Sequence, residues 1–99
     1  MDMKKLMNVH PGEILSDVIE ELGISTYRLA KETHMPASNL YDIIAGKRGI
    51  TADISVRLGR FFEQSDQFWL NIQNSYEFRK IQHEREKEFA TIRSYKKVI

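Results

Sequence analysis

The apolar residues of this chain recur every three to four positions, which is the spacing of amphipathic helices. The first such segment begins at Pro11, a residue favoured at the first position of a helix, and its apolar stripe ends at Leu22. Acidic residues lie on the other face, and Gly23 follows where helices commonly end in a left-handed residue. The pattern predicts a helix over residues 11–22 with one face in a core.

Two shorter helices are expected next, separated by a break at a proline. Ser25 is a residue type that caps helix N-termini, and Pro36 disfavours helical geometry in the residue before it. The second helix is therefore predicted over about 26–33 and the third over about 37–45, where Gly46 ends it. The residues that the third helix is expected to turn inward are Leu40, Ile43 and Ile44.

Two further helices and a charged extension are expected in the second half. Either Thr51 or Asp53 starts a fourth helix, with Ile54, Leu58, Phe61 and Phe62 facing a core. Ser65 is expected to cap a fifth helix that carries Phe68, Trp69, Ile72 and Tyr76 on one side. Residues 78–88 are highly charged, which indicates a solvated helical extension. Residues 89–99 lack a helix stop signal and are either a frayed tail or a strand that docks on a partner.

The short link between the second and third helices is the feature most informative about function. A turn of about four residues between two helices favours the crossed helix-turn-helix arrangement, and the small side chain of Ala30 lets the helices pass closely. In this motif the first turn of the later helix is exposed to the major groove of DNA. That turn carries Ala37, Ser38 and Asn39, with Tyr41 and Asp42 a turn further on and Lys47 and Arg48 beyond the helix.

The chain is thus predicted to be all-α. Helices this short cannot each bury a stripe alone, so they must pack as one compact bundle, which 99 residues with 41% hydrophobic content can form. The expected organisation is an N-terminal arm (1–10), a helix-turn-helix domain (11–64), a fifth helix with its extension (65–88) and a tail (89–99).

Charge by itself gives mild evidence against DNA binding. The net charge is only +1, and residues 11–64 hold more acidic than basic side chains. Any contact with phosphates must therefore come from a local basic cluster. The candidates for such a cluster are Arg28, Lys31, Lys47 and Arg48.

Over residues 8–80 the sequence resembles the HigA-type, or VapI-type, antitoxins of the Xre helix-turn-helix group. The segments that carry the resemblance are HPGEIL, ISTYRLAKET, NLYDIIAGKRGITADISVRLGRFF and QFWLNIQ. The combination of GKRGIT with FWLNIQ is more specific than helix-turn-helix spacing. The resemblance implies a five-helix, lambda-repressor-like domain that dimerises on a palindromic operator. It also implies a partner, a small HigB-like ribonuclease toxin, and autorepression of the shared operon.

The resemblance also assigns roles to individual residues. The residues expected to face base edges are Ala37, Ser38, Asn39 and Asp42, and those expected to bind phosphates are Thr26, Arg28, Tyr41, Lys47 and Arg48. Two positions depart from the family pattern. Thr26 stands where glutamine is usual, and His34 stands in the turn where glycine is usual, so left-handed angles at His34 imply strain.

Several of these residues have simpler interpretations. Ser38 and Asn39 are residue types that cap helices, and Lys47 and Arg48 suit an ordinary solvated loop. The helix over 66–88 is either a surface helix or a dimer interface; we favour an interface, because an apolar face beyond a four-helix core needs a cover. Its expected contact residues are Phe68, Trp69, Ile72 and Tyr76.

Other classes of function find little support. No window approaches the roughly 18 consecutive apolar residues of a membrane span. The absence of cysteine suits the cytoplasm, where we expect the protein. The three histidines are isolated, and Lys87 replaces the second histidine of a zinc-protease motif, so neither a metal, a cofactor nor an enzyme is expected. Three hypotheses remain: a repressor that is also an antitoxin, a stand-alone regulator, and a protein-interaction module that has lost DNA binding.

Overall fold

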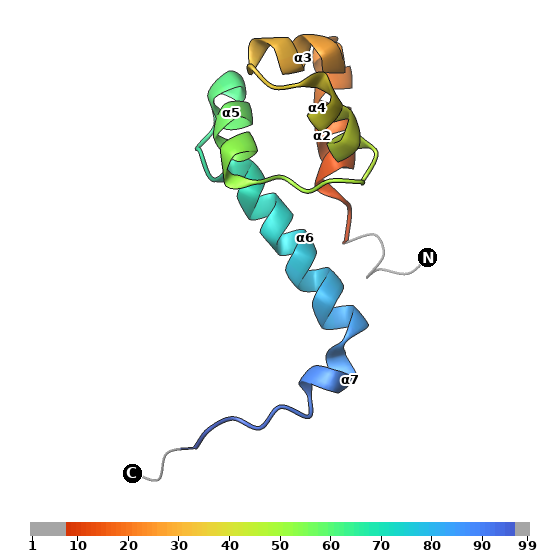
Figure 1. The fold of residues 1–99 in the computed structure, drawn as a ribbon, viewed down its shortest axis with the longest axis vertical. Coiled ribbons are helices and arrows are strands. Elements are labelled where there is room, and N and C mark those ends of the chain that lie inside the picture. The colour runs from red at the N-terminus through yellow and green to blue at the C-terminus, as the bar shows by residue number, and fades with distance from the viewer. Residues whose placement is uncertain (1–7, 97–99) are drawn as a thin grey trace.

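The structure, a computed structural model, describes residues 8–96 and is all-helical over that range, as the sequence predicts. Its helices are α2 (Pro11–Leu22), α3 (Thr26–Glu32), α4 (Ala37–Ile44), α5 (Ala52–Phe62), α6 (Phe68–Glu84) and α7 (Glu86–Phe89). Figure 1 shows α2 to α5 gathered into a rounded unit from which α6 extends away toward the C-terminus. We call residues 8–76 the head and residues 77–96 the arm. The expected organisation of residues 1–7 and 97–99 lies outside the described residues.

Local signals place the ends of the first helices where the sequence predicts them. Gly23 ends α2 in the left-handed region with φ of 70°. Ser25 caps α3, because its Oγ accepts a hydrogen bond from the backbone N–H of Arg28 at 3.0 Å. Thr51 caps α5 by accepting from the N–H of Ile54 at 3.3 Å. The cap of α2 is a further feature: Nδ1 of His10 accepts from the N–H of Gly12 at 2.9 Å.

The predicted cap of α6 is wrong. Ser65 does not cap the helix with its side chain; its backbone carbonyl accepts from the N–H of Phe68 at 3.2 Å, and Gln67 is the N-cap residue. The first turn of α6 is satisfied instead from α5. Ser55 Oγ accepts from the N–H of Leu70 at 2.9 Å and donates to the carbonyl of Asp66 at 2.6 Å. A residue on a neighbouring helix thus replaces the local cap.

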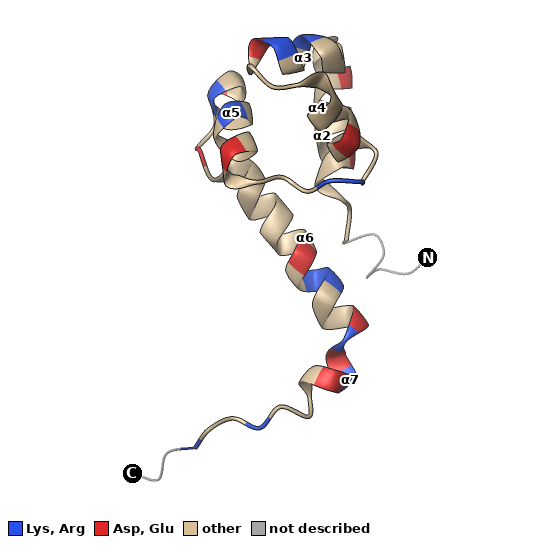
Figure 2. Ribbon diagram, viewed as in Figure 1, with Lys and Arg blue, Asp and Glu red and all other residues tan. Residues whose placement is uncertain are grey.

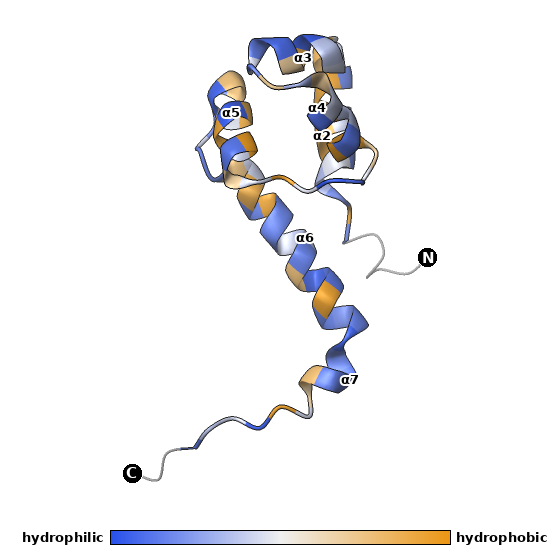
Figure 3. Ribbon diagram, viewed as in Figure 1, coloured by the Kyte–Doolittle hydropathy of each residue, from blue (hydrophilic) through white to orange (hydrophobic). Residues whose placement is uncertain are grey.

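One hydrophobic cluster holds the head together. Its buried members come from every helix of the head and from two of its connecting segments: Leu15, Ile19, Leu29, Ala30, Met35, Leu40, Ile43, Ile50, Ile54, Leu58 and Trp69. Figure 3 shows that most residues of α3 and of the far half of α6 are hydrophilic. Ile44, Phe61, Phe62 and Ile72 pack against the cluster from its edge.

Trp69 belongs to this core and not to a surface. Its side chain has 0% exposure, and its Nε1 donates to Oε1 of Gln64 at 2.7 Å. A side chain without exposed surface in the single chain has nothing to offer a partner. The expectation that Trp69 contributes contacts to a dimer interface is therefore corrected, while Phe68, Ile72 and Tyr76 keep some exposure.

The arm is the solvated extension that the charge pattern predicts, although it is not one continuous helix. The α-helical hydrogen bonding breaks at Arg85, and the four-residue helix α7 follows. Between Lys87 and Lys96 every side chain is exposed, and the described part of the tail contains no strand. Within residues 8–96, no helix is long and apolar enough to cross a membrane.

Candidate nucleic-acid interface

Helices α3 and α4 form the crossed pair of a helix-turn-helix. Ala30 of α3 is 1% exposed, so its small side chain lies at a tight contact within the core. Leu29 of α3 and Leu40 and Ile43 of α4 are fully buried beside it. The four apolar side chains fix the two helices as a unit, which leaves the opposite face of α4 free.

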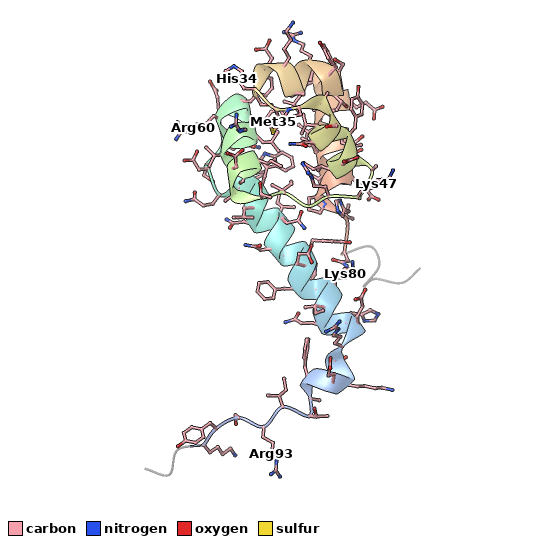
Figure 4. All side chains as sticks on the ribbon, viewed as in Figure 1. His34, Met35, Lys47, Arg60, Lys80 and Arg93 are labelled. Carbon is pink, nitrogen blue, oxygen red and sulfur yellow. The ribbon has the colours of Figure 1, made fainter. Side chains whose placement is uncertain are left out.

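The turn between these helices is closely determined by hydrogen bonds. The hydroxyl of Thr33 donates to the carbonyl of Leu29 at 2.7 Å, and the N–H of Met35 donates to the carbonyl of Ala30 at 2.9 Å. His34 adopts φ of 59°, the left-handed conformation that the glycine of the family pattern would take without strain. Met35 turns its side chain into the core at the same point. Figure 4 shows His34 and Met35 at this end of the head.

Arg57 of α5 braces the turn from outside the motif. Its Nη1 donates to the carbonyl of Thr33 at 3.1 Å and to that of His34 at 3.2 Å. Its Nε donates to Oδ1 of Asp53 at 2.6 Å, which orients the guanidinium. These contacts satisfy carbonyls that the strained turn leaves without helical partners. Sequence reasoning missed Arg57, because its partners lie more than twenty residues earlier in the chain.

The first turn of α2 supports the far end of α4. Gly12 is buried, and a Cβ atom placed on it would lie 1.9 Å from the carbonyl oxygen of Ile43. Only glycine permits this approach of two backbones. The ring of His10 meets that of Tyr76 edge to face at 5.0 Å, so the same turn also contacts α6. The HPGE segment is therefore a support for the last turn of α4.

The outward face of α4 is open to solvent. Ser38, Tyr41 and Ala45 are exposed, and Asn39 and Asp42 are half-buried beside them. Pro36 is the N-cap residue and no side chain caps the helix, so Ser38 and Asn39 are not engaged as caps. Ala37 packs against the core instead, so it contributes little to this face. Ala45 is an exposed position on the same face that sequence reasoning missed.

Basic side chains lie near both ends of α4. Figure 2 shows blue segments on α3, where Arg28 and Lys31 are exposed, and on the loop after α4. Figure 4 places Lys47 on the opposite side of the head from His34. Lys47 and Arg48 are both exposed.

The distribution of charge within the head resolves the apparent conflict with DNA binding. Acidic residues of the head are concentrated on α2, which carries Glu13, Asp17, Glu20 and Glu21. From Thr26 to Arg48 the basic side chains outnumber the acidic ones, Glu32 and Asp42. The negative total of residues 11–64 therefore does not describe the helix-turn-helix itself, in which basic side chains are in excess.

The residues expected at the DNA interface lie on α3, on α4 and on the loop that follows α4, and none of them is buried. Thr26 is the first residue of α3 and is half-buried, while Tyr41 projects from the middle of α4 with 52% exposure. Such a surface combines short polar side chains on a helix with flanking cations, which is the composition that reads groove edges and binds phosphates. Among the described residues, no group of three or more His, Asp or Glu side chains is arranged to hold a metal ion.

Comparison with known proteins gives consistent matches. The chain is 38% identical over 79 residues to Virulence-associated protein I of Dichelobacter nodosus, covering 79% of this chain and 73% of the relative. It superposes on an addiction module antidote protein of a HigA family from Coxiella burnetii with a TM-score of 0.84 and 34% identity, covering 89% of this chain and 98% of the other.

A third match was solved with DNA. The Pseudomonas aeruginosa antitoxin HigA, in a structure with the higBA promoter, has a TM-score of 0.83 and 37% identity and covers 90% of this chain and 99% of the other. No protein-family model matches the sequence.

Proposed function

Because this chain belongs to the HigA family of helix-turn-helix antitoxins, which includes Virulence-associated protein I, we propose that it is an antitoxin that binds operator DNA and represses its own operon. The observation that carries this proposal is the open face of α4. Polar side chains in its first turn are not engaged as helix caps, and exposed basic residues precede and follow the helix in the sequence. This face is positioned by packing of α3 and α4 in the core and by the hydrogen bonds of Arg57 to the turn before α4.

In the proposed complex, the first turn of α4 enters the major groove. Ser38, Asn39 and Asp42 face base edges there, and Asp42 is suited to accept from the amino group of a cytosine. Ala37 also lies in this turn, but it packs partly against the core, so only its backbone and the rest of its methyl group are available to the DNA. The phosphate contacts are assigned to Thr26, Arg28, Tyr41, Lys47 and Arg48.

We propose that the protein forms homodimers that bind an inverted repeat. Phe68, Ile72 and Tyr76 lie on α6 at the edge of the core and keep exposed or half-exposed surface. A two-fold axis near α6 would place the two α4 helices on one side of the DNA, about 34 Å apart, which is one helical turn.

The protein partner that we propose is a small HigB-like ribonuclease toxin. The supporting observations are the family membership and the similarity to the Pseudomonas aeruginosa antitoxin, which was solved with a promoter named for a higBA pair. A neighbouring gene for a small basic protein, and co-purification of its product with this chain, would support the pairing. Operator binding with no such neighbour and no co-purified protein would instead make this chain a stand-alone regulator.

Fluorescence anisotropy tests the central part of the proposal. The purified chain is titrated against its own upstream DNA and against a scrambled sequence at several salt concentrations. We expect tight binding to the upstream DNA only, with an affinity that falls as salt rises because phosphate contacts release counterions. Equal, weak binding to both sequences would contradict a specific repressor and favour an interaction module.

Two variants separate the assigned roles. Replacing Lys47 and Arg48 by alanine should weaken binding to all sequences and reduce its salt dependence. Replacing Asn39 by alanine should leave the salt dependence unchanged and lower discrimination between sequences by about 1–3 kcal/mol for each base contact that is removed. An Asn39 variant with full discrimination would show that the base-reading face is assigned wrongly.

A further inference from the structure

The loop between α4 and α5 carries two of the proposed phosphate-binding side chains. Its first half is fixed to α4: the N–H of Gly46 donates to the carbonyl of Ile43 at 3.0 Å, and that of Lys47 to the carbonyl of Asp42 at 2.8 Å. Gly46 has φ of 76°, which reverses the chain after the helix. Lys47 and Arg48 follow, exposed and without a salt bridge to any residue between 8 and 96.

The second half of the loop is held by a buried side chain of α6. Oε1 of Gln73 accepts from the N–H of Ile50 at 2.8 Å, and the Ile50 side chain is buried in the core. Gly49 lies directly against the Gln73 amide, because a Cβ atom on this glycine would be 3.1 Å from the amide carbon. Lys47 and Arg48 therefore lie between two fixed points of the loop. Hydrogen bonds to α4 hold the backbone on one side of them, and Gln73 holds it on the other.

The orientation of the Gln73 amide is itself determined. Its Nε2 donates to Oε1 of Glu77, one turn further along α6, at 2.8 Å. This second bond directs the amide oxygen toward the loop, since the amide would otherwise be free to present its NH2 group to Ile50. A buried backbone N–H without an acceptor is costly, so loss of this oxygen would favour movement of the loop toward water.

We propose that Gln73 is the positioning residue of the phosphate-binding loop, and that its amide fixes the backbone from which Lys47 and Arg48 reach DNA. This inference rests on the proposed function, because the loop must bind phosphates for its position to matter. It assigns to α6 a role in DNA binding although α6 itself lies outside the helix-turn-helix.

The test uses Gln73→Met, which keeps the length of the side chain and removes both hydrogen bonds. Anisotropy titrations of the full chain with its upstream DNA should show an affinity about three- to tenfold lower, as expected for the loss of one or two hydrogen bonds. The slope of log affinity against log salt should become shallower by about one for each phosphate that the loop no longer reaches.

A matched control distinguishes positioning from general weakening of the fold. Ser55→Ala removes another buried hydroxyl, which bonds to Asp66 and Leu70 at the start of α6 and makes no side-chain hydrogen bond to the loop. Its melting temperature should fall while its salt slope stays that of the wild type. A Gln73→Met protein with reduced melting temperature and a wild-type slope would overturn the proposal.

A double-mutant cycle gives the sharpest result. In a background where Lys47 and Arg48 are both alanine, Gln73→Met should cause no further loss of affinity, because the loop no longer holds a cation to position. An additive loss would overturn the role of Gln73. A wild-type chain that binds no DNA at all would instead remove the proposed function and, with it, this role.

If Gln73→Met does not fold, Glu77→Ala decides the question, since Glu77 is exposed. Removal of a negative charge from the protein would by itself strengthen, not weaken, its binding to DNA. A weaker affinity with a shallower salt slope would therefore support the proposal, because it reports loss of the oriented amide. An unchanged slope would overturn it.

Discussion

The head and the arm of this molecule obtain their structure in different ways. In the head, polar groups distant in sequence bond to one another: Arg57 holds the turn before α4, Gln73 holds the loop after it, and Ser55 satisfies the start of α6. In the arm, the polar contacts are local, such as the hydroxyl of Thr91 with the carbonyl of Glu88 at 2.6 Å. The head therefore presents a preformed surface, whereas none of the arm residues 77–96 is buried.

The exposed apolar residues strengthen this contrast. In the arm, Phe78 is 64% and Tyr95 is 91% exposed, and none of its residues is buried. Inside the head, three supports converge on the backbone around α4, from α2, α5 and α6. Substitutions should therefore differ in effect according to how directly they disturb those supports.

The largest effect is expected from Gly12→Ala. The added methyl group would lie 1.9 Å from the carbonyl oxygen of Ile43, so either α2 or the last turn of α4 must move. We expect a loss of about 2–4 kcal/mol in the free energy of unfolding, measured by urea denaturation.

Gly23→Ala is the matched control for Gly12→Ala. A Cβ on Gly23 meets nothing within 4 Å, although its φ of 70° is unfavourable for alanine. This variant should lose only about 1–2 kcal/mol. A Gly12→Ala protein no less stable than Gly23→Ala would contradict the close backbone contact between α2 and α4.

A smaller effect is expected from Arg57→Ala. The substitution leaves the carbonyls of Thr33 and His34 without their donor, so the free energy of unfolding should fall by about 1 kcal/mol. Operator affinity should fall as well, because this turn positions the first turn of α4, which is proposed to enter the major groove. Arg60→Ala, also on α5, removes only the exposed ion pair with Asp66, so it should lose less stability than Arg57→Ala and keep the operator affinity of the wild type. Equal behaviour of the two variants would show that Arg57 does not brace the turn.

These supports also mark the limit of what the sequence predicts. Pro11, Gly23, Ser25 and Thr51 act within a few residues along the chain, so the helix ends that they set are predictable. The partners of Arg57 and Gln73 lie more than twenty residues earlier, and only the packing of the helices brings them together. The same reason explains the wrong cap of α6: Ser65 has a suitable side chain, but Ser55 on a neighbouring helix already satisfies the first turn.

The face of α4 was predictable in part for a related reason. The buried positions Leu40 and Ile43 follow from helical periodicity, and they leave Ser38 and Tyr41 outward. Ala37 is less informative, because a small apolar residue in a first turn suits either the core or a groove wall. Its packing against the core depends on the angle between the helices, which the sequence does not specify.

A weak pH dependence is expected from the link between α5 and α6. Hydrogen bonds from Arg60 hold the pKa of Asp66 below its usual value, so the folded state favours the ionised carboxylate. The stabilisation is present above the pKa of the unfolded chain, about 3.9, and is lost as pH falls through the lower folded value. The stability difference between the wild type and Asp66→Asn should therefore shrink as pH falls below about 4. A difference that stays constant from pH 7 to 3 would contradict the assignment.

The smallest effect on the head is expected from removal of the arm beyond Glu84. None of the residues 85–96 is buried, so the truncated chain should unfold within about 0.5 kcal/mol of the wild type in urea at low protein concentration. If the exposed Phe89 and Ile92 pack between two copies, the urea concentration at the unfolding midpoint of the wild type should rise with protein concentration. The midpoint of the truncated chain should rise less. A truncated chain that is less stable at every concentration would show that the arm packs on its own head, and the contrast between the two regions would then be wrong.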